Sequence, residues 1–582
     1  MSLPRVWAPL ARSVELERGG QRQAMQQTRG GWWQAQLPLA HGEDYAFVVD
    51  GDGPFPDPRS PWQPQGVHGP SRHVDHARFT WHDGGWRAPP LACALIYELH
   101  VGTFTAEGSF DGAISRLDAL VELGVTHVEL MPVNAFPGRH GWGYDGAALY
   151  APHQPYGGPD ALKRLVAACH ARGLAVLLDV VYNHLGPDGN YLARFGPYFT
   201  RRYATPWGEA VNLDGADSDE VRRFFIDNAL MWLSDYHFDG LRVDAVHAIV
   251  DQSARHFLEQ LTAEVRALEA ALCRPLVVIA ESDLNDPRLL RPPEAGGYGM
   301  DAQWSDDFHH SLHALLTGER AGYYADFGAV GDIAAALTRR FVYDGRYSAF
   351  RRRRHGRPAL EIPAERFLGY LQNHDQVGNR ARGERIGALV SRQRLMIAAA
   401  LVLTAPFVPL LFQGEEWNAS APFLYFTDHQ DPRLGAAVRD GRRAEFAAFG
   451  WDPASIPDPQ AEDSFRRSRL DWSERRRGPH AQILDWYRRL IALRRAHPDL
   501  AAGAPADVQY DEGARWLVCV RGSIVVACNF AASAQQLPLP PAQGHEVLLS
   551  SEESAAPTNQ TVRLAAESVA LLRRAAFTGD SS

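Results

Sequence analysis

Strand-like and helix-like patterns alternate along the middle of the chain. Short apolar runs, typical of buried parallel strands, are followed by longer stretches whose apolar residues recur with helical spacing. Strands are predicted at residues 96–101, 128–133, 175–182, 241–245, 276–280, 302–304, 367–372 and 408–412, and helices at 110–123, 160–171, 220–236, 253–268, 392–403 and 481–497. This alternation predicts an α/β fold, a (β/α)8 TIM barrel with inserted loops, over residues 91–500.

The regions on either side of the barrel lack the helical period. Residues 1–90 are rich in Gly, Pro and Trp and contain short alternating runs at 32–37 and 45–49, which predict an immunoglobulin-like N-terminal β-sandwich. Exposed Trp residues there could bind sugar, but core packing is the favoured interpretation. Residues 501–582 contain two strand-like runs joined at a Gly turn, within 516–530, and predict a C-terminal β-sandwich domain.

Composition places the chain among globular proteins with more than one core. It has 582 residues, of which 45% are hydrophobic and 22% charged. The net charge of -10 argues against a general nucleic-acid binder, because neutralising phosphates requires a basic surface. The local exception is the run of arginines at 351–354, for which a solvated loop is favoured over a polyanion site.

The cysteines and the longest apolar run bear on location. The five cysteines are odd in number and their spacing resembles no zinc motif, which predicts reduced core thiols in a cytoplasmic protein: Cys93, Cys169, Cys273, Cys519 and Cys528. The first residues lack the features of a signal peptide. The apolar run 396–412 is short for a membrane span and contains Pro406 and Pro409, so no membrane association is expected.

Carboxylates stand where several predicted strands end. Within residues 240–247, Arg242 and Asp244 alternate with apolar residues, so they lie on one side of a buried strand and can pair. Such pairing keeps Asp244 ionised as a candidate nucleophile, although a structural ion pair would have the same pattern. Glu281 and Asp375 each follow another predicted strand. Together they predict an active site at the carboxyl-terminal rim of the barrel.

Four segments in this order, at successive strand ends, are similar to the signature regions of one enzyme family. They are residues 179–184, 240–247, 279–281 and 373–375, and they resemble the α-amylase family of glycoside hydrolases. The resemblance implies retaining hydrolysis, with Asp244 as nucleophile, Glu281 as general acid/base and Asp375 binding hydroxyls of the distorted ring. Retaining chemistry requires the first two carboxyl groups to lie about 5 Å apart.

The same resemblance implies a set of substrate-binding residues. Tyr144 would stack on a sugar ring, and His184 and His374 would hydrogen-bond its hydroxyls, with structural histidines as the alternative. The whole expected set is Tyr144, Asp145, His184, Arg242, His247, Asp283, His374 and Gln376. Asn183 stands where many α-amylases bind calcium, but one Asn does not make a calcium site. No metal and no cofactor are therefore expected.

Finer features indicate a subgroup of that family. Residues 97–105 resemble both glucan branching enzymes and the trehalose-releasing hydrolases, whereas 186–191, 279–286, 422–429 and 445–451 resemble the latter. The implied reaction is hydrolysis of the α-1,4 bond next to the terminal trehalose of maltooligosyltrehalose. A maltooligosyltrehalose synthase acting upstream would supply that substrate.

Two alternatives remain open beside this hydrolase. A branching enzyme would transfer the glycosyl group to a sugar hydroxyl instead of water. A sugar-binding scaffold without activity is disfavoured, because a scaffold has no chemical need for all three carboxylates.

Overall fold

A closed barrel of parallel strands forms the centre of the protein. The computed structural model describes residues 3–448, 452 and 456–575, so Phe449, Gly450 and Trp451 of the segment at 445–451 lie outside the described residues. The barrel order is β10-β13-β16-β17-β18-β21-β22-β9. Its strands are β9 (Ile96–Leu99), β10 (His127–Leu130), β13 (Ala175–Val180), β16 (Gly240–Val243), β17 (Val277–Ala280), β18 (Ala302–Trp304), β21 (Phe367–Tyr370) and β22 (Val408–Phe412). The predicted barrel and its strands are confirmed.

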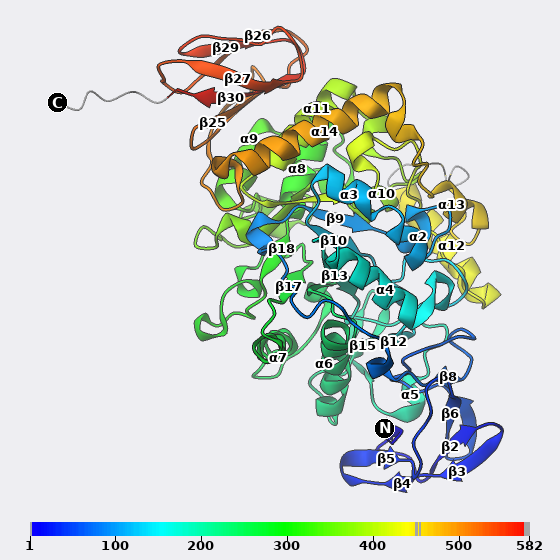
Figure 1. The fold of residues 1–582 in the computed structure, drawn as a ribbon. Coiled ribbons are helices and arrows are strands. Elements are labelled where there is room, and N and C mark those ends of the chain that lie inside the picture. Colours follow the sequence, from blue (N-terminus) through cyan, green and yellow to red (C-terminus); the bar gives the residue numbers. More distant parts are fainter. Residues whose placement is uncertain (1–2, 449–451, 453–455, 576–582) are drawn as a thin grey trace.

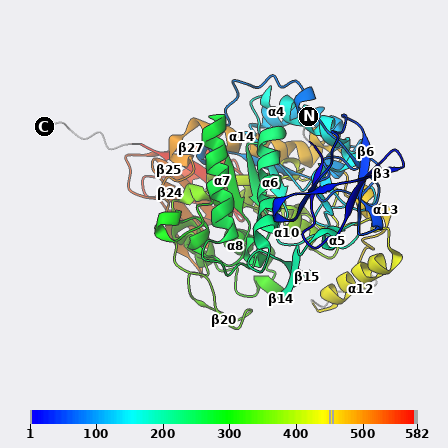
Figure 2. The same ribbon diagram turned by 90° about the horizontal axis from the view of Figure 1, so that it is seen from below.

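Helices surround the barrel (Figure 1). The long ones are α4 (Gly158–His170), α6 (Ser218–Asp235), α7 (Phe257–Leu272), α8 (Asp306–Thr317), α9 (Val330–Arg339), α11 (Arg392–Thr404), α12 (Pro432–Ala448) and α14 (Gly478–Ala496). Helix α12 belongs to the inserted segment after β22 and lies at the outer edge of the molecule in Figure 2. The predictions did not include α8, α9 or α12.

Two predicted helices differ from the structure for local reasons. The helix predicted at 110–123 is divided into α2 (Phe110–Ile114) and α3 (Leu117–Leu123). At the break, the Ser115 hydroxyl donates to the Gly112 carbonyl at 2.7 Å, a local bond that competes with continuing the helix. The helix predicted from residue 253 begins only at Phe257, because the Asp251 side chain accepts from the backbone N–H groups of Ser253 and Phe257 and holds the chain between them as a loop.

The barrel lumen changes character along its length. Its lower part is apolar, with Ile96, Leu177 and Val408 in one buried cluster. Its upper part holds buried charged residues, among them Arg242, whose neighbours along β16 are apolar. The alternation seen in the sequence therefore separates a helix-facing side of β16 from a lumen-facing side that carries charge.

Small antiparallel sheets lie before and after the barrel, at opposite ends of the molecule (Figure 1). The N-terminal sheets comprise β1 (Arg5–Trp7), β2 (Val14–Arg18), β3 (Gln21–Ala24), β4 (Gln26–Gln27), β5 (Trp32–Gln34), β6 (Asp44–Val49), β7 (Asp52–Phe55) and β8 (Ser71–Arg72). Trp7 and Trp33 are buried, as core packing requires.

The C-terminal sheets comprise β23 (Asp507–Asp511), β24 (Trp516–Arg521), β25 (Ile524–Asn529), β26 (Gln535–Pro538), β27 (His545–Ser550), β28 (Ala556–Pro557), β29 (Thr561–Leu564) and β30 (Ser568–Arg574). Gly522 makes the predicted turn between β24 and β25, with a φ of 56° that favours glycine. The predicted C-terminal β-domain is confirmed, and the domain limits at residues 90 and 500 stay predictions.

The cysteines are all free, but they are not all in the core. Cys169, Cys519 and Cys528 are buried, whereas Cys93 and Cys273 are exposed. The prediction of core thiols was wrong for these two, because Cys93 is the last residue of a short 3-10 helix and Cys273 directly follows the last residue of α7. Among the described residues, no helix combines the length and apolar character that crossing a membrane requires.

Candidate active site

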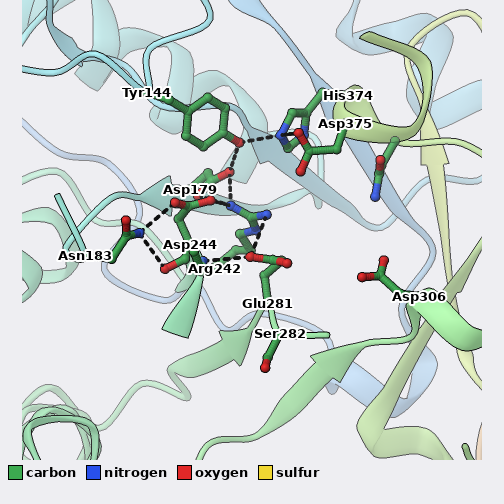
Figure 3. Close-up of polar contacts among 12 residues, drawn as sticks. Tyr144, Asp179, Asn183, Arg242, Asp244, Glu281, Ser282, Asp306, His374 and Asp375 are labelled. Atoms are coloured by element: carbon green, nitrogen blue, oxygen red, sulfur yellow. Dashed lines mark hydrogen bonds and ion pairs between the residues drawn. The ribbon is translucent and has the colours of Figure 1, made fainter. Parts of the chain in front are cut away.

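The Arg242 guanidinium lies at the centre of a polar network at the upper end of the lumen (Figure 3). Its Nη1 donates to Asp244 Oδ1 at 2.8 Å and to the Asp179 oxygens at 2.9 and 2.8 Å. Asn183 Nδ2 donates to the other Asp244 oxygen at 2.7 Å. The guanidinium also lies 4.3 Å from the ring centre of Trp304. Charge-assisted bonds thus hold both oxygens of the Asp244 carboxylate in place.

Glu281, which directly follows β17, has a different environment. Its Oε2 accepts at 2.7 Å from the backbone N–H of the residue after Asp244, and Arg242 Nη2 lies 3.8 Å away. Burial raises the pKa of Glu281 well above its usual range; Arg242 opposes this rise, and the charges of Asp244, Asp306 and Asp375 add to it. Glu281 therefore keeps a proton at a pH where an ordinary glutamate has lost it.

His374 and Tyr144 form the wall above this pair of carboxylates. His374 Nδ1 contacts Glu98 Oε1 at 2.5 Å, and its Nε2 lies 2.7 Å from the Tyr144 hydroxyl, which donates to Asp179 at 2.5 Å. Burial alone would lower the pKa of His374, but Asp375 and Glu98 outweigh it and raise the pKa to about 9. The Asp375 side chain is 41% exposed and lies beside His374 (Figure 3).

His184 is held between the rim and a neighbouring hairpin. Its Nε2 lies 3.0 Å from the Tyr144 carbonyl oxygen. Its ring stacks on Trp207 with 4.5 Å between the centres, at the turn between β14 (Phe199–Thr205) and β15 (Gly208–Val211). Trp207 is about half exposed, at 48%. The sequence analysis did not select this tryptophan.

Asp283 joins the rim to the arginine-rich loop. Its Oδ2 pairs with an Arg351 nitrogen at 2.8 Å, and its carbonyl oxygen lies 2.7 Å from His355 Nε2. Burial would raise the pKa of Asp283, but Arg351 and the exposed His247 lower it. The expectation of a solvated loop is therefore wrong for Arg351, although residues 352–354 are exposed.

The remaining predicted residues also lie at this rim. Asp145 Oδ2 is 3.8 Å from His429 Nε2, which belongs to the segment inserted after β22. Gln376, in α10 (His374–Gly378), has its Nε2 3.4 Å from Asp306 Oδ1. Arg242 and the Asp179–His184 segment, like the three carboxylates, come from the strand ends at this rim.

Besides Trp207, sequence reasoning missed four residues of this site: Glu98, Trp304, Asp306 and Arg351. Glu98 and Asp306 carried the signal used elsewhere, a carboxylate at or just after the end of a barrel strand. Within the described part of the chain, no group of three or more His, Cys, Asp or Glu side chains could hold a metal ion. Asn183 instead donates to Asp244.

Family models match two parts of the chain. The model described as "Alpha amylase, catalytic domain" matches residues 72–203, and "Domain of unknown function (DUF3459)" matches residues 501–571. The second match falls on the C-terminal β-strands.

Solved structures share the whole architecture. A Salmonella typhimurium protein solved as a candidate α-amylase is 38% identical with a TM-score of 0.90, covering 98% of this chain and 97% of its own. A pullulanase from Paenibacillus barengoltzii, 19% identical with a TM-score of 0.72, covers 98% of this chain and 92% of its own and shows the fold alone.

Curated relatives agree over nearly the full length. The malto-oligosyltrehalose trehalohydrolase of Arthrobacter ramosus is 56% identical, covering 90% of this chain and 91% of the relative. The enzyme of the same name from Mycobacterium tuberculosis is 49% identical, covering 98% and 99%. A 1,4-alpha-glucan branching enzyme of Corynebacterium jeikeium is 32% identical over only 52% of this chain and 48% of its own. The chain belongs to the malto-oligosyltrehalose trehalohydrolases, glycosidases of the α-amylase family.

Proposed function

We propose that this protein hydrolyses the α-1,4 bond between the terminal trehalose of maltooligosyltrehalose and the rest of the glucan, with retention of configuration. One observation carries the proposal. A single buried guanidinium, that of Arg242, contacts both Asp244 and Glu281, while the surroundings of these two carboxyl groups differ. Asp244 is held by donors on both oxygens, whereas Glu281 keeps its proton. A nucleophile and an acid are thereby set side by side.

In the first half of the reaction the glycosidic bond breaks. An Asp244 oxygen attacks the anomeric carbon, and the Glu281 proton passes to the glycosidic oxygen. The bonding electron pair leaves with that oxygen, so trehalose departs neutral and the maltooligosaccharide remains as an ester of Asp244.

In the second half, water releases the ester. Glu281, now ionised, takes a proton from a water molecule, whose oxygen attacks the anomeric carbon while the bond to Asp244 breaks. The carboxylate and the protonated acid are restored. Two inversions at one carbon give net retention.

The surrounding residues support the developing positive charge of the ring. We assign Asp375 to ring hydroxyls, because its side chain is 41% exposed beside the catalytic pair. His374, protonated at neutral pH and fixed by Glu98, is assigned to a neighbouring hydroxyl, for which its Nε2 exchanges its contact with the Tyr144 hydroxyl. Tyr144 is assigned to stacking on the ring. His184 has the same role only if it exchanges its contact with the Tyr144 carbonyl for one with the sugar.

Selectivity for the trehalose end is assigned to the other side of the catalytic pair. Asp283 and His247 lie on loops beyond the barrel strands, where loop shape can fit the α,α-1,1 kink of trehalose. A maltooligosyltrehalose synthase would supply the substrate, in the cytoplasm. The absence of disulfides among the five cysteines is compatible with that compartment.

A product assay tests the function. Purified enzyme is incubated with maltooligosyltrehalose, the products are separated, and the anomeric proton of the new reducing end is followed by NMR from the first minutes. We expect free trehalose and an α-configured maltooligosaccharide. Formation of α-1,6 branches on amylose without trehalose would replace this function by that of a branching enzyme, and a β-configured first product would exclude retention.

A further inference from the structure

Asp306 is a carboxylate of the rim to which neither the mechanism nor the sequence assigns a role. It is the first residue of α8 and lies just beyond β18, the barrel strand next to the Glu281 strand. Its Oδ1 accepts from the Tyr370 hydroxyl at 2.5 Å and from Gln376 Nε2 at 3.4 Å. Its Oδ2 accepts no hydrogen bond from residues 3–448, 452 or 456–575, and the side chain is only partly buried. One oxygen is anchored and the other is available to a ligand.

The position of Asp306 relates it to the leaving group. Figure 3 shows its carboxylate on the side of Glu281 that faces away from Asp244. In a double displacement the glycosyl ring lies over the nucleophile, and the leaving sugar lies beyond the acid that protonates it. In the proposed reaction, Asp306 therefore stands where the trehalose unit must lie.

We propose that Asp306 is a fourth carboxylate with a role in the reaction, beside Asp244, Glu281 and Asp375. Its Oδ2 binds a hydroxyl of the leaving trehalose unit, and its negative charge helps Glu281 keep its proton. This inference rests on the function proposed above and names a residue of the leaving-group subsite. The buried Tyr370 hydroxyl, which has no other hydrogen bond in the described part of the chain, positions the carboxylate.

The charges around both groups set the direction of the effect. Asp306 is faced by Tyr370 and by Asp283, Asp375 and Asp307; burial and these carboxylates raise its pKa to about 7, against the Tyr370 hydrogen bond. The charge of Asp306 also acts on the Tyr323 hydroxyl, whose pKa it helps to raise. Glu281 is faced by Arg242, Asp244, Asp306 and Asp375. An ionised Asp306 raises the pKa of Glu281, so its removal lowers that pKa and moves the basic limb of the pH profile to lower pH.

Two variants test the proposal, with kcat and KM for maltooligosyltrehalose measured across the pH range. Asp306→Asn should raise KM about tenfold, the effect of losing one charged hydrogen bond, and move the basic limb down by about one pH unit. Tyr370→Phe keeps the carboxylate but removes its anchor, so both effects should be smaller and in the same direction. The control is Asp118→Asn, an exposed carboxylate of the surrounding helix α3 that pairs with Arg172, which should match wild type.

A wild-type KM or an unshifted basic limb in folded Asp306→Asn would overturn the proposal. Should that variant fail to fold, Tyr370→Phe carries the same test, and wild-type values there would overturn it. A failure of the proposed function is a separate result: the wild-type enzyme itself would then release no trehalose from maltooligosyltrehalose. The pH limb of Glu281 can then still be compared between variants on a plain maltooligosaccharide.

Discussion

The glycosyl side and the leaving-group side of the catalytic pair are built differently. On the glycosyl side, Asp244, Asp179, Tyr144 and His374 are joined to Arg242 or to one another by short hydrogen bonds. Asp179 and Asp244 come from barrel strands or their immediate ends, and Tyr144 and His374 from the segments that follow β10 and β21. On the leaving-group side, Asp283 and Asp306 stand on a loop and a helix start, and Asp283 is 35% exposed.

This difference predicts that one side of the site sets the reaction rate and the other sets substrate selectivity. A network fixed before the substrate arrives stabilises developing charge without reorganising during the reaction. Groups that keep unbonded oxygens at an open rim can instead form new bonds with a particular leaving sugar. Changes on the glycosyl side should therefore act mainly on kcat, and changes on the leaving-group side on KM and on the choice of substrate.

The largest effect is expected from Asp244→Asn. The amide cannot form the glycosyl ester, so turnover should fall by at least about 10⁴-fold, roughly 5.5 kcal/mol of barrier. Stopped assays of trehalose release, with melting temperature as the check on folding, measure it. Near-normal turnover in the folded variant would remove Asp244 from the role of nucleophile.

Glu281→Gln should have a large effect that depends on the leaving group. Without the proton of Glu281, maltooligosyltrehalose should react about 10³-fold more slowly, whereas an aryl glycoside with an acidic leaving group needs little protonation and should lose much less. Both substrates are compared in one preparation of the variant. Equal losses on the two would count against Glu281 as the acid.

The sequence predicted the glycosyl side because its chemistry follows the strands. Arg242 lies on β16 and Asp244 directly follows it, Glu281 directly follows β17, and Asp375 stands at the start of α10, a short distance after β21, so the barrel itself brings them together. Glu98 was within reach of the same rule, since it precedes the last residue of β9.

The leaving-group side could be predicted only in part: Asp306 follows β18 and carried the same signal, but the contacts between loops did not. Asp283 and Arg351 are 68 residues apart, and only the folded loops make them neighbours. Helix α8, which carries Asp306, was not predicted from the sequence, because buried histidines such as His309 and His313 interrupt its apolar pattern. Burial of polar residues depends on what packs against them, which no local period reveals.

Glu98→Gln should have an intermediate effect and a distinct pH signature. The raised pKa of His374, about 9 against 6.5, means that its charge stabilises the fold fully below pH 6.5, and that this stabilisation is lost as pH rises through about 9. In the variant, the loss of stability between pH 6.5 and pH 9 should be smaller. Its kcat should fall about 10- to 100-fold, because His374 loses the partner that positions it. Urea unfolding at pH 6 and pH 10 measures the first effect. If the free energy of unfolding changed equally between pH 6 and pH 10 in the variant and in wild type, this account of the Glu98–His374 pair would be contradicted.

The smallest effect, and the one most specific to the leaving-group side, is expected from Arg351→Gln. The pair with Asp283 is partly exposed, so its loss should cost little stability but leave Asp283 less well placed. The kcat/KM for maltooligosyltrehalose relative to a maltooligosaccharide of equal length should fall about 3- to 10-fold, with kcat for the latter nearly unchanged. The matched control is Arg353→Gln, an exposed arginine of the same loop with no ion pair among the described residues, which should leave the ratio as it is. A ratio unchanged by Arg351→Gln, or lowered equally by both variants, would show that the two sides of the catalytic pair do not divide rate from selectivity in this way.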